Sequence, residues 1–132
     1  MKCPLRVLLV EDSTPFRRFI CSTLAKREDL KVICEVSDGQ EAVLKAQELK
    51  PDLILLDIGL PTLNGIEAAR RIRELSPESR IIFLTQESSP EVVQMALDLG
   101  AWGYVRKVTA GSDLLAAVDT VLAGRRFVSS NL

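Results

Sequence analysis

The chain has 132 residues, of which 47% are hydrophobic and 27% are charged, and its formal net charge is −1. This length predicts one domain, and this apolar content excludes a disordered chain, because enough apolar surface can be buried to offset the ordering entropy. With 17 basic against 18 acidic residues, the chain also lacks the basic footprint that is typical of nucleic-acid binding.

Short apolar runs alternate with longer amphipathic stretches along the chain. The runs are rich in Val, Ile and Leu, which favours strands buried on both faces, at Leu5–Val10, Lys31–Val36, Asp52–Leu56, Arg80–Leu84 and Gly103–Arg106. Between and after them, apolar residues recur at helical spacing over 16–24, 42–49, 66–75, 92–99 and 114–122. Pro15 suits a first helical turn, and Gly100 and Gly124 suit the ends of the last two helices.

Five alternating strand–helix units predict an α/β fold with a single doubly wound parallel sheet. The common order for five such strands is 2-1-3-4-5, the flavodoxin-like arrangement, with the switch point between strands 1 and 3. Ligands of these sheets bind at the carboxyl ends of the strands. Functional residues are therefore expected directly after each strand.

Charged and hydroxyl side chains do occupy those places. Glu11 and Asp12 follow the first run, Asp57 ends the third, Thr85 ends the fourth and Lys107 follows the fifth. Two unit charges 4 Å apart repel by about 4 kcal/mol at an effective dielectric of 20, so three converging carboxylates need a cation. Mg²⁺ prefers oxygen ligands and is the predicted metal.

Each of these residues also has an ordinary explanation. Asp12 could be the N-cap of the first helix, and Glu11 could lie in a solvated loop. Thr85 and Lys107, taken singly, are common strand and surface residues. Asp57 is harder to explain in this way, because it ends an apolar run and the next helix starts only near Asn64.

Histidine and cysteine usage narrows the chemistry further. The chain has no histidine, which excludes Ser-His-Asp and Cys-His catalysis and His-ligated zinc. The wide spacing of Cys3, Cys21 and Cys34 predicts buried free thiols rather than disulfides or a metal motif. No apolar run reaches the length of a membrane span, and the N-terminal run is too short for a signal peptide, so a cytoplasmic protein without membrane contact is expected.

Together, Val10-Glu11-Asp12, Asp57 followed by Leu60-Pro61 and Gly65, Thr85 and Lys107 resemble the receiver domain of two-component response regulators. The resemblance covers residues 5 to about 124. It implies that Asp57 accepts a phosphoryl group from a phosphohistidine on a sensor histidine kinase. It further implies a signalling domain that catalyses only its own phosphorylation and dephosphorylation, rather than an enzyme with a separate substrate.

The same resemblance implies the other site roles. Glu11, Asp12, Asp57 and the backbone carbonyl of Gly59 would hold Mg²⁺. Thr85 and Lys107 would bind the phosphoryl oxygens, and Tyr104 would change rotamer on activation. Homodimer formation on phosphorylation is a further implication.

The chain departs from the family pattern at two positions. Val108 stands where proline usually follows the lysine, and a cis bond there would cost about 3–4 kcal/mol without proline, so the loop geometry is expected to differ. Gln86 stands where a small residue usually follows the threonine, and it is expected to screen the site.

The residues after Ala123 resemble the junction that follows the receiver in the NarL/LuxR-type branch. Residues 1–124 are therefore expected to be the receiver, and residues 125–132 the start of a linker. The linker would lead to a helix-turn-helix output domain that controls transcription and makes any DNA contact. A stand-alone receiver acting through protein contacts is the alternative within the family.

Other families with this chemistry fit less well. An FMN-binding flavodoxin needs a first loop that cradles phosphate, and Glu11 and Asp12 would repel it. A haloacid-dehalogenase-type phosphatase needs a second aspartate where Gly59 stands, and the G-x-G-x-x-G of NAD-binding domains is missing.

Overall fold

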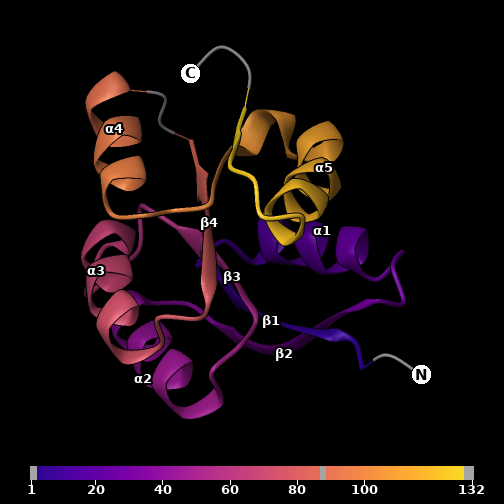
Figure 1. Ribbon diagram of the computed structural model, residues 1–132, viewed down its shortest axis with the longest axis horizontal. Helices are drawn as coiled ribbons and strands as arrows, with labels where there is room; N and C mark the ends of the chain where they lie inside the picture. The colour runs from indigo at the N-terminus through magenta and orange to yellow at the C-terminus, as the bar shows by residue number, and fades with distance from the viewer. Residues whose placement is uncertain (1–2, 87–88, 130–132) are drawn as a thin grey trace.

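The computed structural model describes residues 3–86 and 89–129. Strands and helices alternate as predicted (Figure 1). The strands that precede a helix are β1 (Leu5–Val10), β2 (Leu30–Val36), β3 (Leu53–Asp57), β4 (Arg80–Thr85) and β5 (Gly103–Arg106). The helices are α1 (Thr14–Leu24), α2 (Gly39–Leu49), α3 (Gly65–Leu75), α4 (Pro90–Asp98) and α5 (Ala110–Leu122), with the short 3-10 helix η1 (Lys107–Thr109) between β5 and α5.

The strands form one parallel sheet with helices on both faces. Helices α2, α3 and α4 cover one face and α1 and α5 the other (Figure 1). Because both faces are covered, β3 is buried along its whole length, and the last four residues of β1 are buried as well. The register sets Val10 beside Leu56, which brings the ends of β1 and β3 to the same edge. The carboxyl ends therefore meet as the doubly wound fold predicts.

The expected five-stranded sheet is wrong in one respect, because the sheet has six strands in the order β2-β1-β3-β4-β5-β6. Strand β6 (Phe127–Val128) pairs in parallel with β5, placing Phe127 beside Gly103 and Val128 beside Tyr104. It lies within the residues expected to begin the linker. This strand consists of only two residues, which follow a glycine and two arginines in the sequence. So short a segment forms no apolar run, and hydrophobic periodicity does not predict it. Residues 130–132 of the expected linker lie outside the described residues.

Side-chain caps fix where the helices after β1 and β3 begin. Ser13 caps α1 by accepting a hydrogen bond from Phe16 N at 3.4 Å, so the alternative role of Asp12 as the cap is wrong. Asn64 caps α3 by accepting from Glu67 N at 3.0 Å. Because Ser13 rather than Asp12 caps α1, the Asp12 carboxylate is not needed as the helix cap and can serve at the edge of the sheet.

The structure also bears on the expectations for the cysteines, for the bond after Lys107 and for membrane spans. The three cysteines are free, as predicted. The prediction that they are buried is wrong for Cys3, which is exposed, and is only partly met by Cys21 and Cys34, which are half-buried. No cis peptide bond occurs in the described residues, and Lys107 and Val108 lie within η1. Of the helices that the structure describes, none has the length and apolar character that a membrane span requires.

Candidate functional site: an acidic cleft at the carboxyl edge

The residues predicted from the strand ends meet in one cleft. This cleft has a volume of about 360 Å³ and lies where β1, β3, β4 and β5 end. Its lining comes from four loops and combines acidic, hydroxyl, amide and basic groups: Asp12, Ser13, Asp57, Gly59, Thr85, Gln86 and Lys107. Gln86 is one of the lining residues, and its screening of the site stays a prediction.

Three carboxylates converge on this cleft. One oxygen from each of Glu11, Asp12 and Asp57 lies within 4.8 Å of the others. The three differ in burial, because Glu11 is fully buried, Asp57 is 5% exposed and Asp12 is exposed. A solvated loop position for Glu11, the ordinary explanation weighed above, is therefore wrong. Its Oε2 instead accepts a hydrogen bond from Ser13 N at 2.9 Å.

Lys107 supplies the positive charge. Its Nζ lies 2.7 Å from Glu11 Oε1 and 3.1 Å from Asp57 Oδ2, and it also lies 4.9 Å from the centre of the Phe16 ring. Burial acts to lower the pKa of Lys107, but its contacts with the two carboxylates outweigh burial and raise that pKa above its ordinary value. The ammonium ion is thus held in its charged form between two buried acids.

Burial raises the pKa of Glu11, and the nearby charge of Asp57 adds to this effect. Contacts with Lys107 and with the Ser13 amide oppose it. Glu11 Oε1 makes ion-pair contact with Lys107, yet among the described residues it has no partner at hydrogen-bond geometry. A buried oxygen in this state, beside two further carboxylates and only one ammonium, suits a second cation with oxygen preference. The residues present therefore fit Mg²⁺.

The loop after β3 holds Asp57 in place. Asp57 Oδ1 accepts a hydrogen bond from Gly59 N at 3.1 Å, and Ile58 O accepts one from Gly65 N at 2.8 Å. A Cβ atom at Gly65 would lie 2.2 Å from the Asp57 backbone oxygen, so only glycine permits this close approach. The first residue of α3 therefore packs directly against the backbone of Asp57.

Thr85 and Tyr104 lie on the two strands beyond β3. Thr85 is 1% exposed at the end of β4 and pairs in register with Arg106 of β5. Tyr104 is fully buried, with its ring centre 6.4 Å from that of Phe83. In this conformation the aromatic side chain that the resemblance expects to change rotamer already lies inside the core.

Two contributors to the site were not predicted. The Ser13 amide that binds Glu11 and the Phe16 ring beside Lys107 both come from the start of α1. Phe16 was interpreted only as part of the apolar face of α1. Helical periodicity could have shown that it points toward the sheet, but not that the lysine after β5 would reach it.

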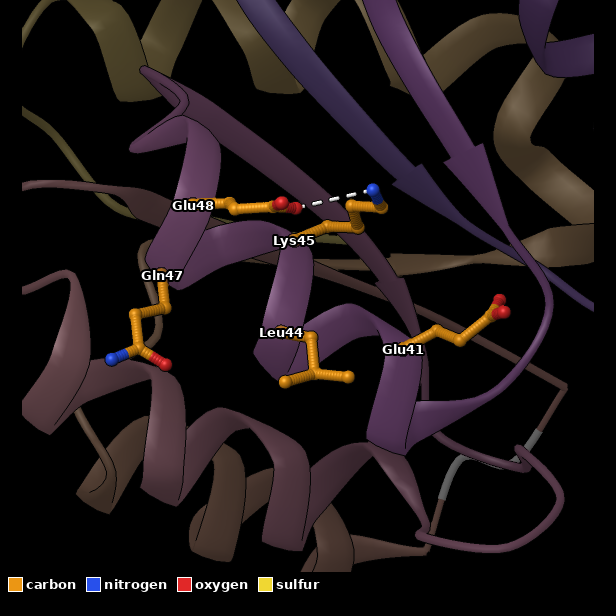
Figure 2. Close-up of a pocket in the computed structure, with 5 residues that line it drawn as sticks. All are labelled: Glu41, Leu44, Lys45, Gln47 and Glu48. Atoms are coloured by element: carbon orange, nitrogen blue, oxygen red, sulfur yellow. Dashed lines mark hydrogen bonds and ion pairs between the residues drawn. The ribbon is translucent and has the colours of Figure 1, made fainter.

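A larger hollow, of about 560 Å³, lies on the outer surface of α2. Figure 2 shows its lining residues, Glu41, Leu44, Lys45, Gln47 and Glu48, all from this one helix. Lys45 and Glu48 pair with each other at 3.1 Å, and Leu44 is 58% exposed. Its charged groups do not converge on a common point as they do in the acidic cleft, so its size alone does not make it the functional site.

Comparison with known proteins is consistent with this geometry. A family model described as the response regulator receiver domain matches residues 7–119. The chain is 38% identical over 120 residues to the response regulator protein VraR of Staphylococcus epidermidis, which covers 91% of this chain and 57% of that relative. The chain thus spans little more than half the length of this relative.

Solved structures agree. A LuxR-family two-component response regulator from Aurantimonas sp. superposes with a TM-score of 0.91 at 33% identity, covering 97% of this chain and 91% of that one. The isolated receiver (REC) domain of RcsB from Salmonella enterica, solved with the phosphomimetic BeF3−, gives a TM-score of 0.90 at 25% identity, covering 96% and 94%.

Proposed function

This chain belongs to the response regulator receiver domain family, and on that premise we propose that Asp57 accepts a phosphoryl group from a sensor histidine kinase in a Mg²⁺-dependent reaction. The observation that carries the proposal is the contact of Lys107 with Asp57 inside a cluster of three carboxylates. Asp57 ends β3, which lies between β1 and β4 in the sheet. The reaction would occur in the cytoplasm and would switch the domain between two conformations.

In the transfer, a carboxylate oxygen of Asp57 forms a bond to phosphorus as the bond from phosphorus to the donor nitrogen breaks. The donor imidazole leaves with that electron pair. Charge builds up on the three equatorial oxygens, so catalysis consists mainly of positioning and charge stabilisation. Lys107, which contacts Asp57 Oδ2, would donate to one of these oxygens and the Thr85 hydroxyl to another, while the Gly59 amide would orient Asp57 through its Oδ1.

Bound Mg²⁺ would neutralise the carboxylates and draw the phosphoryl oxygens to the cleft. Asp12 and Asp57 would bind it directly, with the backbone carbonyl of Gly59. Glu11 is fully buried behind them and already bonded to Ser13 N, which supports a role through water rather than direct coordination. Lys107 would then be released from Glu11 toward the phosphoryl group.

The output is proposed to be transcriptional. The similarity to a LuxR-family two-component response regulator supports a receiver that controls transcription through a DNA-binding output domain. A stand-alone receiver that acts by protein contact is the alternative. In either case the chain modifies only itself and has no separate substrate. An FMN site has less support, because its phosphate would meet Glu11 and Asp12 in the first loop.

The Mg²⁺ requirement tests this proposal. Incubation with acetyl phosphate and Mg²⁺ is expected to add one alkali-labile phosphoryl group by intact-mass measurement, and excess chelator is expected to prevent it. Asp12→Ala should weaken Mg²⁺ binding far more than Glu48→Ala, which removes an exposed carboxylate of α2. Equal labelling with and without chelator would contradict the metal role.

A further inference from the structure

Ser129, the residue after β6, attaches this end of the described chain to β5 by hydrogen bonds. Ser129 follows β6, yet it is only 3% exposed. Its amide donates to Tyr104 O at 2.9 Å, and its hydroxyl accepts from Arg106 N at 3.1 Å. The hydroxyl also donates to Asp113 Oδ2 at 2.8 Å. The amide and the hydroxyl of Ser129 therefore bond to β5, which precedes Lys107, and the hydroxyl also bonds to α5, which follows it.

Asp113 connects this serine to the turn that carries Lys107. The same oxygen, Oδ2, accepts a second hydrogen bond from Thr109 Oγ1 at 2.7 Å. Thr109 is the last residue of η1 and Lys107 is its first, and η1 has no side-chain cap of its own. One carboxylate oxygen thus joins the turn of Lys107 to a residue that lies beyond the last helix.

We propose that Asp113 and Ser129, together termed the C-terminal clasp, are positioning residues for Lys107. The inference rests on the proposed function and deepens it. The clasp fixes the backbone on both sides of Lys107, through Arg106 N and Thr109 Oγ1, and so sets how far its ammonium reaches toward a phosphoryl group. Because such coupling is reciprocal, phosphoryl binding also strengthens the attachment of Ser129 to β5 and α5.

A role of the clasp in folding alone would differ from this in one measurable way. Lys107 contacts the phosphoryl group, whereas Mg²⁺ is held by the carboxylates. Loss of the clasp should therefore weaken binding of the phosphoryl analogue at saturating Mg²⁺ and leave Mg²⁺ affinity unchanged. A clasp that served only stability would change neither affinity well below the unfolding temperature.

The test uses the full 132-residue chain. Mg²⁺ affinity is measured by calorimetry, and beryllofluoride affinity at saturating Mg²⁺ by NMR titration. Ser129→Ala and Asp113→Ala each remove two hydrogen bonds of the clasp. They are expected to weaken beryllofluoride binding by about fivefold or more, since one net hydrogen bond corresponds to about fivefold. Asp113→Asn should lie nearer to wild type, because its amide oxygen still accepts. The control is Thr120→Ala, which removes an α5 hydroxyl that donates to Ala116 O within the same helix.

Hydrogen exchange of the wild-type protein provides a readout that does not depend on the variants folding. Beryllofluoride should slow exchange of the Arg106 and Ser129 amides, whose bonds belong to the clasp. Unchanged exchange, clasp variants that bind beryllofluoride as wild type does, or an equal loss of both affinities would overturn the inference. A wild-type protein that binds no beryllofluoride with Mg²⁺ would instead contradict the proposed function.

Discussion

Lys107 compensates two buried carboxylates at once, and its removal should cost more than the loss of an ordinary ion pair. The side chains of Glu11 and Asp57 are 0% and 6% exposed. Lys107→Ala leaves both uncompensated, and we expect the free energy of unfolding without metal to fall by about 3 kcal/mol. Chemical denaturation measures this, and saturating Mg²⁺ should recover part of the loss.

The matched control for that variant is Lys45→Ala. Lys45 pairs with Glu48 on exposed α2, where ion pairs contribute less than about 1 kcal/mol. Equal destabilisation by the two substitutions, or a Mg²⁺ effect no greater in Lys107→Ala than in wild type, would contradict the role assigned to Lys107.

At the residue scale, the sequence predicted the acids and the lysine of the cleft because strand ends in a parallel sheet share one edge. It did not predict how buried each side chain would be. Glu11 and Asp12 are adjacent in the sequence, yet Glu11 is buried and Asp12 is exposed. The backbone amide of Ser13 and the ring of Phe16 also escaped prediction. Contacts of this kind depend on where α1 begins to within one residue.

At the scale of elements, the junction of β3 and α3 makes a specific prediction about two nearby glycines. Gly65→Ala would drive its Cβ against the Asp57 backbone, so the loop must shift. We expect lower stability and Mg²⁺ affinity weakened by about tenfold or more, because a displaced carboxylate no longer meets the strict geometry of this ion.

Gly59→Ala is the control for that substitution. A Cβ at Gly59 meets no atom within 4 Å, and its φ is not in the left-handed region. Its carbonyl would be retained, so both stability and Mg²⁺ affinity should stay close to wild type. Calorimetric titration of the two variants with Mg²⁺ checks this, and similar affinities would contradict the packing argument.

The five strands that precede helices were predictable because each is a short run rich in apolar residues, and the five α-helices because each shows helical periodicity. Strand β6 was not, because it has two residues and depends on an edge that β5 offers. Hydrogen bonds to Trp102 O and Tyr104 O hold this segment in place. Tertiary pairing of this kind leaves no periodicity in the sequence.

At the scale of the whole molecule, phosphorylation is expected to change self-association. Thr85 ends β4 directly before the loop to α4, and a shift of its hydroxyl toward a phosphoryl oxygen would move that loop. Tyr104 is already buried, so the response should come from Thr85 and α4 rather than from inward motion of the ring. A two-state change of this kind requires phosphoryl contacts that differ between the states.

Sedimentation velocity with and without beryllofluoride measures this response. We expect a shift from monomer toward dimer, which is lost in Thr85→Ala although beryllofluoride is still bound at Asp57. A monomer both with and without beryllofluoride, with unchanged amide exchange in α4, would show that the domain does not switch through Thr85 and α4.

Asp57 is the proposed phosphoacceptor, and locating the phosphoryl group on the chain tests this assignment. Wild type, Asp57→Asn and the surface variant Glu48→Gln are incubated with acetyl phosphate and Mg²⁺, and the modified residue is located by peptide mass mapping. One phosphoryl group is expected on Asp57 in wild type and in Glu48→Gln, and none in Asp57→Asn. Undiminished labelling of Asp57→Asn would contradict it.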